Sequence, residues 1–282
     1  MKTILLPTDF SKNSINAVHY AMKLLENERC EFYIINIQTA SSFISDDLMT
    51  MSSSATIYQT LIGTAKKSIK NLIHIIETEY KNEKHKFNSI VDYDNFIDAI
   101  NQVSASKSID LIIMGTKGAT GAQKVIFGSN TVRIMQRCET PVLAIPDGCS
   151  FTNMDKIVFT SNYSKICDAK ELKPLLDITK LYNSKIDVLH LLEGQGLTKD
   201  QETNKTFLDS CLSEVDHEFM ELESTNIFKT VQDYIITNDM KMLSMISKKH
   251  SFLERFFARH LVETFAFKID IPFLVIGNTS SN

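Results

Sequence analysis

The sequence predicts an α/β protein built from two tandem units, each an open five-stranded parallel sheet of order 3-2-1-4-5 with helices on both faces. Two observations support this fold class. Short apolar runs alternate with longer amphipathic segments along the whole chain, which is typical of βαβ units. Landmarks of the first half also recur in the second, with ILLPTDFS at 4–11 matched by IVFTSNYS at 157–164, and TPVLAI at 140–145 matched by IPFLVI at 271–276.

The repeat is shorter in its second copy. Asn162 aligns with Asp9, an offset of 162 − 9 = 153, and Pro272 aligns with Pro141, an offset of 272 − 141 = 131. The second unit therefore has 153 − 131 = 22 fewer residues between these landmarks. A polar turn at 147–150 follows the last strand of the first unit, so we expect domains at 1–148 and 149–282.

In the first unit the apolar runs and amphipathic segments alternate regularly. We expect strands at 2–7, 31–37, 86–91, 110–115 and 141–146, and helices at 12–26, 56–82, 93–106 and 127–138. Ser11 is a suitable N-cap for the first helix, because its hydroxyl can accept from a free backbone N–H of the first turn. Residues 39–55 are rich in Ser, Thr, Asp and Met and are expected to form a loop.

The second unit shows the same alternation. We expect strands at 156–160, 185–191, 227–231, 241–246 and 272–276, and helices at 166–183, 202–222, 233–239 and 254–267. Parallel strands joined through helices form right-handed crossovers, which place the carboxyl ends of all strands of a unit on one edge.

Composition limits the function classes. The 282 residues are 43% hydrophobic and 23% charged, as in globular proteins, and the net charge of −4 argues against nucleic acid or an acidic membrane as partner. No apolar run approaches the roughly 18 residues of a membrane span, and 1–7 is too short for a signal peptide. Five scattered cysteines without a CxxC pair suggest reduced thiols, so we expect a cytoplasmic protein.

A glycine constellation follows the fourth strand. Gly115 and Gly118 are followed, after nine residues, by Gly128 and Ser129 at the start of a helix. Glycines allow close backbone approach, and the N–H groups of a helix N-terminus attract anions, so this arrangement predicts a phosphate site. In a sheet of order 3-2-1-4-5, ligands bind where strands one and four diverge, and those strands end at Asp9 and Gly115.

These motifs resemble the universal stress protein family. The resemblance rests on LPTDFS at 6–11, the Gly-x2-Gly-x9-Gly-Ser motif and the closing strand that begins TPV at 140–142, and it covers both units. It implies an adenine nucleotide alpha hydrolase-like fold that binds ATP, with Mg²⁺ on the phosphates, and a role in stress response. It also implies pairing of the last strands of the two units into an intramolecular pseudo-dimer, with a homodimer as a further option.

The resemblance assigns roles to single residues. Asp9 would contact the nucleoside end of ATP, and the backbone of Ile37 would contact the adenine edge. Gly115 would let the chain pass close to the ribose, and Lys117 would contact the phosphates. The expected nucleotide-binding set is Pro7, Thr8, Asp9, Ile37, Met114, Gly115, Lys117, Gly118, Gly128, Ser129, Asn130 and Thr131. The alternative is that these glycines only form turns.

The second unit lacks this constellation. The loop positions of the first unit are Gly115, Gly118, Gly128 and Ser129. The second unit has, in the same order, Ile246, Lys249, Arg259 and His260. We therefore expect no ATP binding of this kind in the second unit. The basic and aromatic segment 248–260 is interpreted first as an amphipathic helix, and alternatively as a different anion site or a partner surface.

Three functions remain open from the sequence. The first is an ATP-binding regulatory protein, the second a slow ATPase or phosphotransferase, and the third a nucleotide-independent scaffold. The sequence offers no recognisable nucleophile elbow, no identifiable catalytic base and no metal-ligand spacing among its seven histidines. His190 ends an apolar run and is interpreted as a satisfied core or crevice residue.

Overall fold

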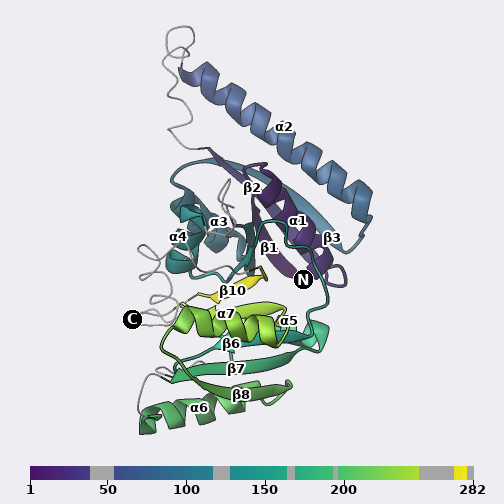
Figure 1. Ribbon diagram of the computed structural model, residues 1–282. Helices are drawn as coiled ribbons and strands as arrows, with labels where there is room; N and C mark the ends of the chain where they lie inside the picture. Colours follow the sequence, from purple (N-terminus) through teal and green to yellow (C-terminus); the bar gives the residue numbers. More distant parts are fainter. Residues whose placement is uncertain (39–53, 117–127, 164–168, 193–195, 248–269, 278–282) are drawn as a thin grey trace.

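The computed structural model contains a single ten-stranded sheet (Figure 1). It describes residues 1–38, 54–116, 128–163, 169–192, 196–247 and 270–277. The strands are β1 (Lys2–Pro7), β2 (Cys30–Gln38), β3 (His85–Tyr93), β4 (Leu111–Gly115), β5 (Val142–Ile145), β6 (Lys156–Thr160), β7 (Lys185–Leu192), β8 (His217–Glu223), β9 (Met242–Ile246) and β10 (Phe273–Ile276). Their order across the sheet is β3-β2-β1-β4-β5-β10-β9-β6-β7-β8.

This order confirms the predicted fold class. The first half of the sheet, β1–β5, and the second half, β6–β10, each have the order 3-2-1-4-5 with parallel neighbours. The two last strands, β5 and β10, pair antiparallel, with Leu274 opposite Leu143. The two expected sheets are therefore joined edge to edge into one.

Seven helices in the described part of the chain cover the two faces of the sheet. They are α1 (Lys12–Leu24), α2 (Ser54–Tyr80), α3 (Phe96–Lys107), α4 (Ser129–Arg137), α5 (Lys173–Tyr182), α6 (Lys199–Leu212) and α7 (Ile227–Thr237). The buried side chains of α1, α2, α5 and α6 belong to one apolar core, and those of α3, α4 and α7 belong to the core on the other face. Each core contains residues from both halves, so the halves share continuous hydrophobic layers.

The helix that follows β1 shows how local sequence fixes an element next to the predicted site. Ser11 caps α1 as expected, with its Oγ accepting from Ser14 N. Ala17, Val18 and Ala21 recur at helical spacing and are buried against the sheet. Because β1 is parallel to both its neighbours, this helix starts at the carboxyl-end edge of the sheet.

Two predictions in the second half are wrong. The segment 227–231, expected as a strand, lies in helix α7, and the helix expected at 202–222 is instead α6 followed by strand β8. In α7 the buried residues Ile227, Val231, Tyr234 and Ile235 follow the helical period, and Asn226 caps the helix. The β-branched residues of this segment favoured a strand locally, whereas packing on the sheet selects the helix.

Other boundaries differ less. Helix α5 begins at Lys173 rather than at 166, and α7 replaces the short helix expected at 233–239. The helix expected at 254–267 and most of the loop expected at 39–55 lie outside the described residues. Among the helices that the structure describes, none is long and apolar enough to cross a membrane.

The halves also meet through α1 and α5. Phe151 lies between Tyr20 and Tyr182, with ring centroids 5.5 Å from each, and the Tyr182 hydroxyl donates to Leu24 O. At the same junction, Lys2 Nζ lies 3.4 Å from the carboxylate of Asp177 in the second half.

Candidate functional site

Two strand ends and one helix start meet at a single edge of the first half. Strand β1 pairs with β4, with Leu5 opposite Ile112, so Asp9 and Gly115 lie at the same carboxyl-end edge. Pro7 pairs with Ile35 of β2, which places Ile37 just beyond. We call this region, with the start of α4, the first-half edge. It contains Pro7, Thr8, Asp9, Ile37, Met114, Gly115, Gly128, Asn130 and Thr131 of the expected set.

Three other members are described only in part or not at all. Ser129 begins α4, so its backbone position is known. Lys117 and Gly118 lie outside the described residues. One hydrogen bond joins the start of α4 to the end of β4, since Thr131 Oγ1 donates to Gly115 O at 3.4 Å.

The loop after β1 is held by several hydrogen bonds. Thr8 N donates to Ile35 O at 2.9 Å, and Thr8 Oγ1 accepts from Phe10 N at 3.0 Å. Phe10 has a φ of 61°, an unfavourable value for a residue that is not glycine. These contacts fix the loop in that conformation, and with it the direction of the Asp9 side chain.

Asp9 is exposed and carries a negative charge at neutral pH. Partial desolvation raises the pKa of Asp9, but hydrogen bonds from Ser11 and from the Ser14 side chain outweigh it and bring the pKa below the usual value. One of these bonds runs from Ser11 N to Asp9 Oδ1 at 3.0 Å. A carboxylate in this state accepts hydrogen bonds from hydroxyl or amino donors and repels phosphate.

Gly115 is required by packing inside the protein. A Cβ at this position would lie 2.6 Å from Asn13 O and 2.8 Å from Asn13 C, in the first turn of α1. The bare backbone therefore lets α1 begin directly beside the end of β4. This structural role exists beside the expected approach to a ribose.

Helix α4 presents its N-terminus at the first-half edge. Gly128 is its N-cap, with extended φ and ψ of −61° and 151°, and it makes no side-chain capping hydrogen bond. A helix N-terminus attracts an anion through its first-turn N–H groups, and the helix dipole favours negative charge there.

The second half repeats the loop but changes the residues around it. Tyr163 has a φ of 51°, and its N–H donates to Ser161 Oγ at 3.2 Å, as Phe10 N does to Thr8 Oγ1. Asn162 replaces Asp9, and Ile246 stands at the end of β9 where Gly115 ends β4. The helix described after this loop, α5, begins at Lys173, and residues 164–168 before it lie outside the described part of the chain.

Two side chains of α6 bind this second loop. Gln201 Nε2 donates to Asn162 O at 2.9 Å, and Asn204 Nδ2 donates to Tyr163 O at 2.8 Å. His190 is 5% exposed, and its Nδ1 lies 2.9 Å from Ser161 O, which confirms its interpretation as a satisfied buried residue. The basic segment 248–260 lies outside the described residues.

Sequence reasoning missed one residue of the first-half edge. Asn36 on β2 is 5% exposed and donates from Nδ2 to Thr8 O at 2.8 Å. A polar residue inside the apolar run YIINI was the available signal.

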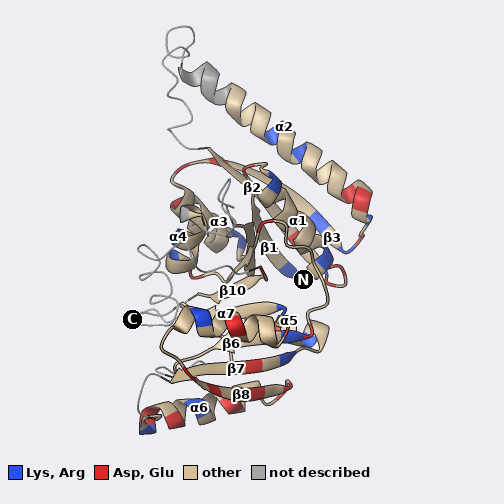
Figure 2. Ribbon diagram, in the orientation of Figure 1, with Lys and Arg blue, Asp and Glu red and all other residues tan. Residues whose placement is uncertain are grey.

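Surface charge and a hollow elsewhere are the other candidate features among the described residues. Figure 2 shows acidic and basic side chains interspersed along α6 and on several strands, in keeping with the small net charge of −4. Among the described residues there is no cluster of His, Cys, Asp and Glu that could hold a metal ion.

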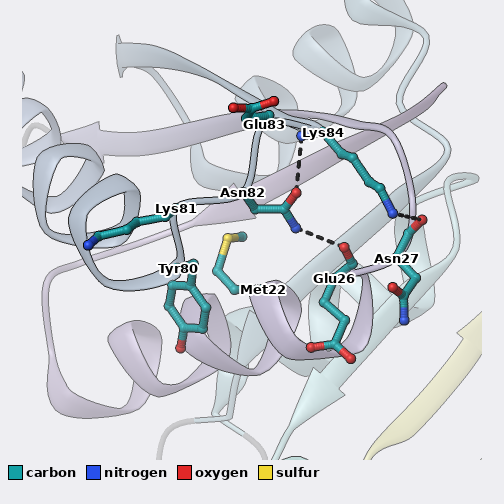
Figure 3. A pocket seen from close by; sticks show the side chains of 8 residues that line it. All are labelled: Met22, Glu26, Asn27, Tyr80, Lys81, Asn82, Glu83 and Lys84. Atoms are coloured by element: carbon teal, nitrogen blue, oxygen red, sulfur yellow. Dashed lines mark hydrogen bonds between the residues drawn. The ribbon is translucent and has the colours of Figure 1, made fainter.

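A hollow of about 480 Å³ lies at the opposite edge of the sheet, beside the amino ends of β2 and β3 (Figure 3). Two of its side chains bond to backbone carbonyls at its rim, since Asn82 Nδ2 donates to Glu26 O at 2.8 Å and Lys84 Nζ donates to Asn27 O at 3.1 Å. It mixes both charges and is separate from the first-half edge.

Comparison with protein families and with known proteins finds matches to universal stress proteins. The family model described as the universal stress protein family matches residues 1–146. Universal stress protein MJ0531 of Methanocaldococcus jannaschii is 27% identical over 151 residues, which is 51% of this chain and 81% of that protein. Universal stress protein MJ0577 of the same organism is 24% identical over 154 residues, 51% of this chain and 94% of that protein.

Solved structures match the whole chain. A universal stress protein from Archaeoglobus fulgidus has a TM-score of 0.70 at 15% identity, covering 99% of this chain and 97% of its own. A putative universal stress protein from Pseudomonas aeruginosa has a TM-score of 0.57 at 10% identity, covering 98% and 93%. At these identities the matches show that the fold extends over both halves.

Proposed function

Because the chain belongs to the universal stress protein family, we propose that it is a stress-response regulatory protein that binds ATP in its first half. The observation that supports this most directly is the meeting of three features at the first-half edge. These are the ionised Asp9 in a fixed loop, the bare backbone at Gly115 and the N-terminus of α4.

Each feature suits a different part of ATP. Asp9 accepts hydrogen bonds from the ribose or base, the backbone at Ile37 meets the adenine edge, and the start of α4 meets the phosphates. Lys117, Gly118, Ser129, Asn130 and Thr131 complete the phosphate cradle in this proposal. Mg²⁺ would bridge the phosphates and would need few protein ligands.

We propose that the second half serves as a structural or partner-binding domain. Domains 1–148 and 149–282 then form a pseudo-dimer within one chain, supported by the pairing of β5 with β10. In the second half Asn162 carries no charge, Ile246 fills the place of the bare backbone, and α6 is bound to the loop. A cytoplasmic location and a further homodimer stay predictions.

The experiment is ATP binding by isothermal titration calorimetry, together with analysis of nucleotide released from the denatured protein. We expect one site per chain. Asp9→Asn installs the residue that the second half already carries in the same loop, so it should preserve the fold and weaken ATP binding by about tenfold or more.

A second pair of variants separates the halves. Gly118→Val should abolish binding because a branched side chain would occupy the phosphate cradle, whereas Lys249→Val, at the aligned position of the second half, should leave affinity unchanged. No nucleotide and no binding would support a nucleotide-independent scaffold, and equal losses in both variants would contradict one intact site. Steady ATP turnover that Asp9→Asn abolishes would favour the slow ATPase.

A further inference from the structure

Asn36 is a buried polar residue at the centre of the first-half edge. It lies on β2 directly before Ile37, and its side chain makes hydrogen bonds in both directions. Nδ2 donates to Thr8 O at 2.8 Å, and Oδ1 accepts from Gln38 Nε2. The accepting carbonyl of Thr8 belongs to the peptide unit that leads into Asp9. A contact on this oxygen therefore fixes the plane from which the Asp9 side chain departs.

The second half makes the same contact with a different residue. His190 Nδ1 lies 2.9 Å from Ser161 O, and because a carbonyl only accepts, Nδ1 carries the proton. The two positions are equivalent in the sheet, since Thr8 N donates to Ile35 O and Ser161 N donates to Leu189 O, one residue before each. A buried donor on the second strand of the half is thus provided twice, once by a carboxamide and once by an imidazole.

The contact holds a loop that is costly to maintain. Phe10 at φ 61° and Tyr163 at φ 51° are both left-handed residues with side chains, a conformation that persists when neighbouring contacts determine it. Thr8 is 5% exposed, so loss of the Asn36 donor would leave a carbonyl there without that partner. The loop would then relax, and Asp9 would lose its fixed direction.

We propose that Asn36 is a positioning residue for nucleotide binding, which acts by holding the Thr8 carbonyl and thereby aiming Asp9. This inference rests on the proposed ATP site, and it predicts that the donor atom matters rather than the carboxamide itself. The residue that the second half uses, histidine, should therefore substitute for asparagine in the first half.

The test compares three variants of the full chain by calorimetry with ATP. Asn36→Asp has nearly the same shape but places an acceptor against the Thr8 carbonyl, so affinity should fall about tenfold or more. Asn36→His restores a donor, with Phe10 available at the place where Tyr163 stacks on His190 at 4.6 Å, and should bind within about threefold of wild type. Circular dichroism confirms that each variant is folded.

His190→Ala is the matched control. It removes the same contact from the second half, so it should lower the thermal midpoint while ATP affinity stays within about twofold of wild type. A merely structural role for both residues would give similar affinity losses in Asn36→Asp and His190→Ala, and that result would overturn the inference.

Two further outcomes distinguish a failure of the positioning role from a failure of the proposed ATP site. If wild type binds ATP and folded Asn36→Asp binds it equally well, or if folded Asn36→His fails to restore binding, the positioning role is wrong and the ATP site stands. If wild type binds no ATP, the proposed function itself fails, and the inference fails with it.

Discussion

At the scale of single residues, the halves differ at the end of the fourth strand, where Gly115 ends β4 and Ile246 ends β9. The glycine allows the first turn of α1 to lie against the end of β4, with Asn13 O only 2.6 Å from where a Cβ would be. An isoleucine in that position needs the space that α1 occupies. The helix described after the corresponding loop, α5, begins at Lys173.

A buried histidine makes the stability of the first half depend on pH. His85 is 9% exposed, lies edge-on to Phe32 at 4.9 Å, and has Nε2 3.0 Å from Leu25 O. Burial lowers the pKa of His85, the bond to Leu25 opposes this, and the charge of Lys84 lowers it further. The net result is a pKa below the usual value, so the folded protein holds this proton less tightly than the unfolded chain.

The sign of the effect follows from this difference. Below a pH of about 6.5 the unfolded chain gains a proton at His85 that the folded protein resists, so stability falls with decreasing pH and recovers as pH rises. We expect His85→Gln, which keeps a donor for Leu25 O, to lose less stability than wild type between pH 7 and pH 5. Urea midpoints at the two pH values measure this. Equal losses would show that other groups cause the dependence.

The residues of the candidate site differ in how readily sequence reveals them. Asp9 and Gly115 follow apolar strands, and the parallel topology alone brings those strand ends together. Asn36 was missed because its partner, Thr8 O, is set by the register between β1 and β2, with Pro7 opposite Ile35. Spacing along one strand carries no information on which carbonyl of its neighbour a side chain will reach.

At the scale of elements, Gln201 in the first turn of helix α6 makes hydrogen bonds both to its own helix start and to the loop after β6. Thr198 and Gln201 form a capping box, in which Gln201 N donates to Thr198 Oγ1 at 3.2 Å and Thr198 N donates to Gln201 Oε1 at 2.9 Å. The same Gln201 side chain donates to Asn162 O at 2.9 Å. The Gln201 side chain therefore bonds both to the N-cap residue of its own helix and to the loop after β6.

We expect Gln201→Ala to cost about 1–2 kcal/mol in the free energy of unfolding, because two hydrogen bonds of the side chain are lost together. Thr198→Ala removes only the N-cap acceptor and should cost about 1 kcal/mol. Urea denaturation of both variants measures the difference. A loss for Gln201→Ala well below that for Thr198→Ala would mean that the bond to Asn162 contributes nothing to stability.

The elements that were misassigned from sequence show the limit of local patterns. Strand β8 reads HEFMELE, whose Glu, Met and Leu are good helix formers, yet it pairs with β7 over its whole length, with Phe219 opposite Val188. Strands that are buried apolar runs were located closely in both halves, such as β4 with four of five residues buried and β9 with all five buried. The edge strand β8 lacks that signal, because none of its residues is buried, and its identity depends on the neighbour with which it pairs.

At the scale of the whole molecule, the two halves are joined by more than the β5–β10 pair. Aromatic contacts through Phe151, the Tyr182 hydroxyl on Leu24 O and the ion pair of Lys2 with Asp177 all cross the junction. The apolar cores on both faces continue from one half to the other. The second half therefore stabilises the half that carries the candidate site.

Gly277 provides the sharpest test of this junction. It follows β10, and a Cβ at this position would lie 1.9 Å from Glu139 O, 2.5 Å from Glu139 C and 2.9 Å from Cys138 O. These atoms belong to the backbone that follows α4 in the first half, so neither partner can yield by rotating a side chain. We expect Gly277→Ala to force the halves apart locally and to cost about 1–3 kcal/mol in the free energy of unfolding.

Gly196→Ala is the control, because no atom of the described residues lies within 4 Å of a Cβ at Gly196, and its effect should stay within about 0.5 kcal/mol. Urea denaturation of both variants gives the comparison.

Helix α4 starts at the first-half edge and ends at Arg137, next to the residues that Gly277 contacts. Displacement of the backbone at Gly277 should therefore also weaken ATP binding. An unchanged free energy of unfolding in Gly277→Ala would show that this contact does not hold the halves together.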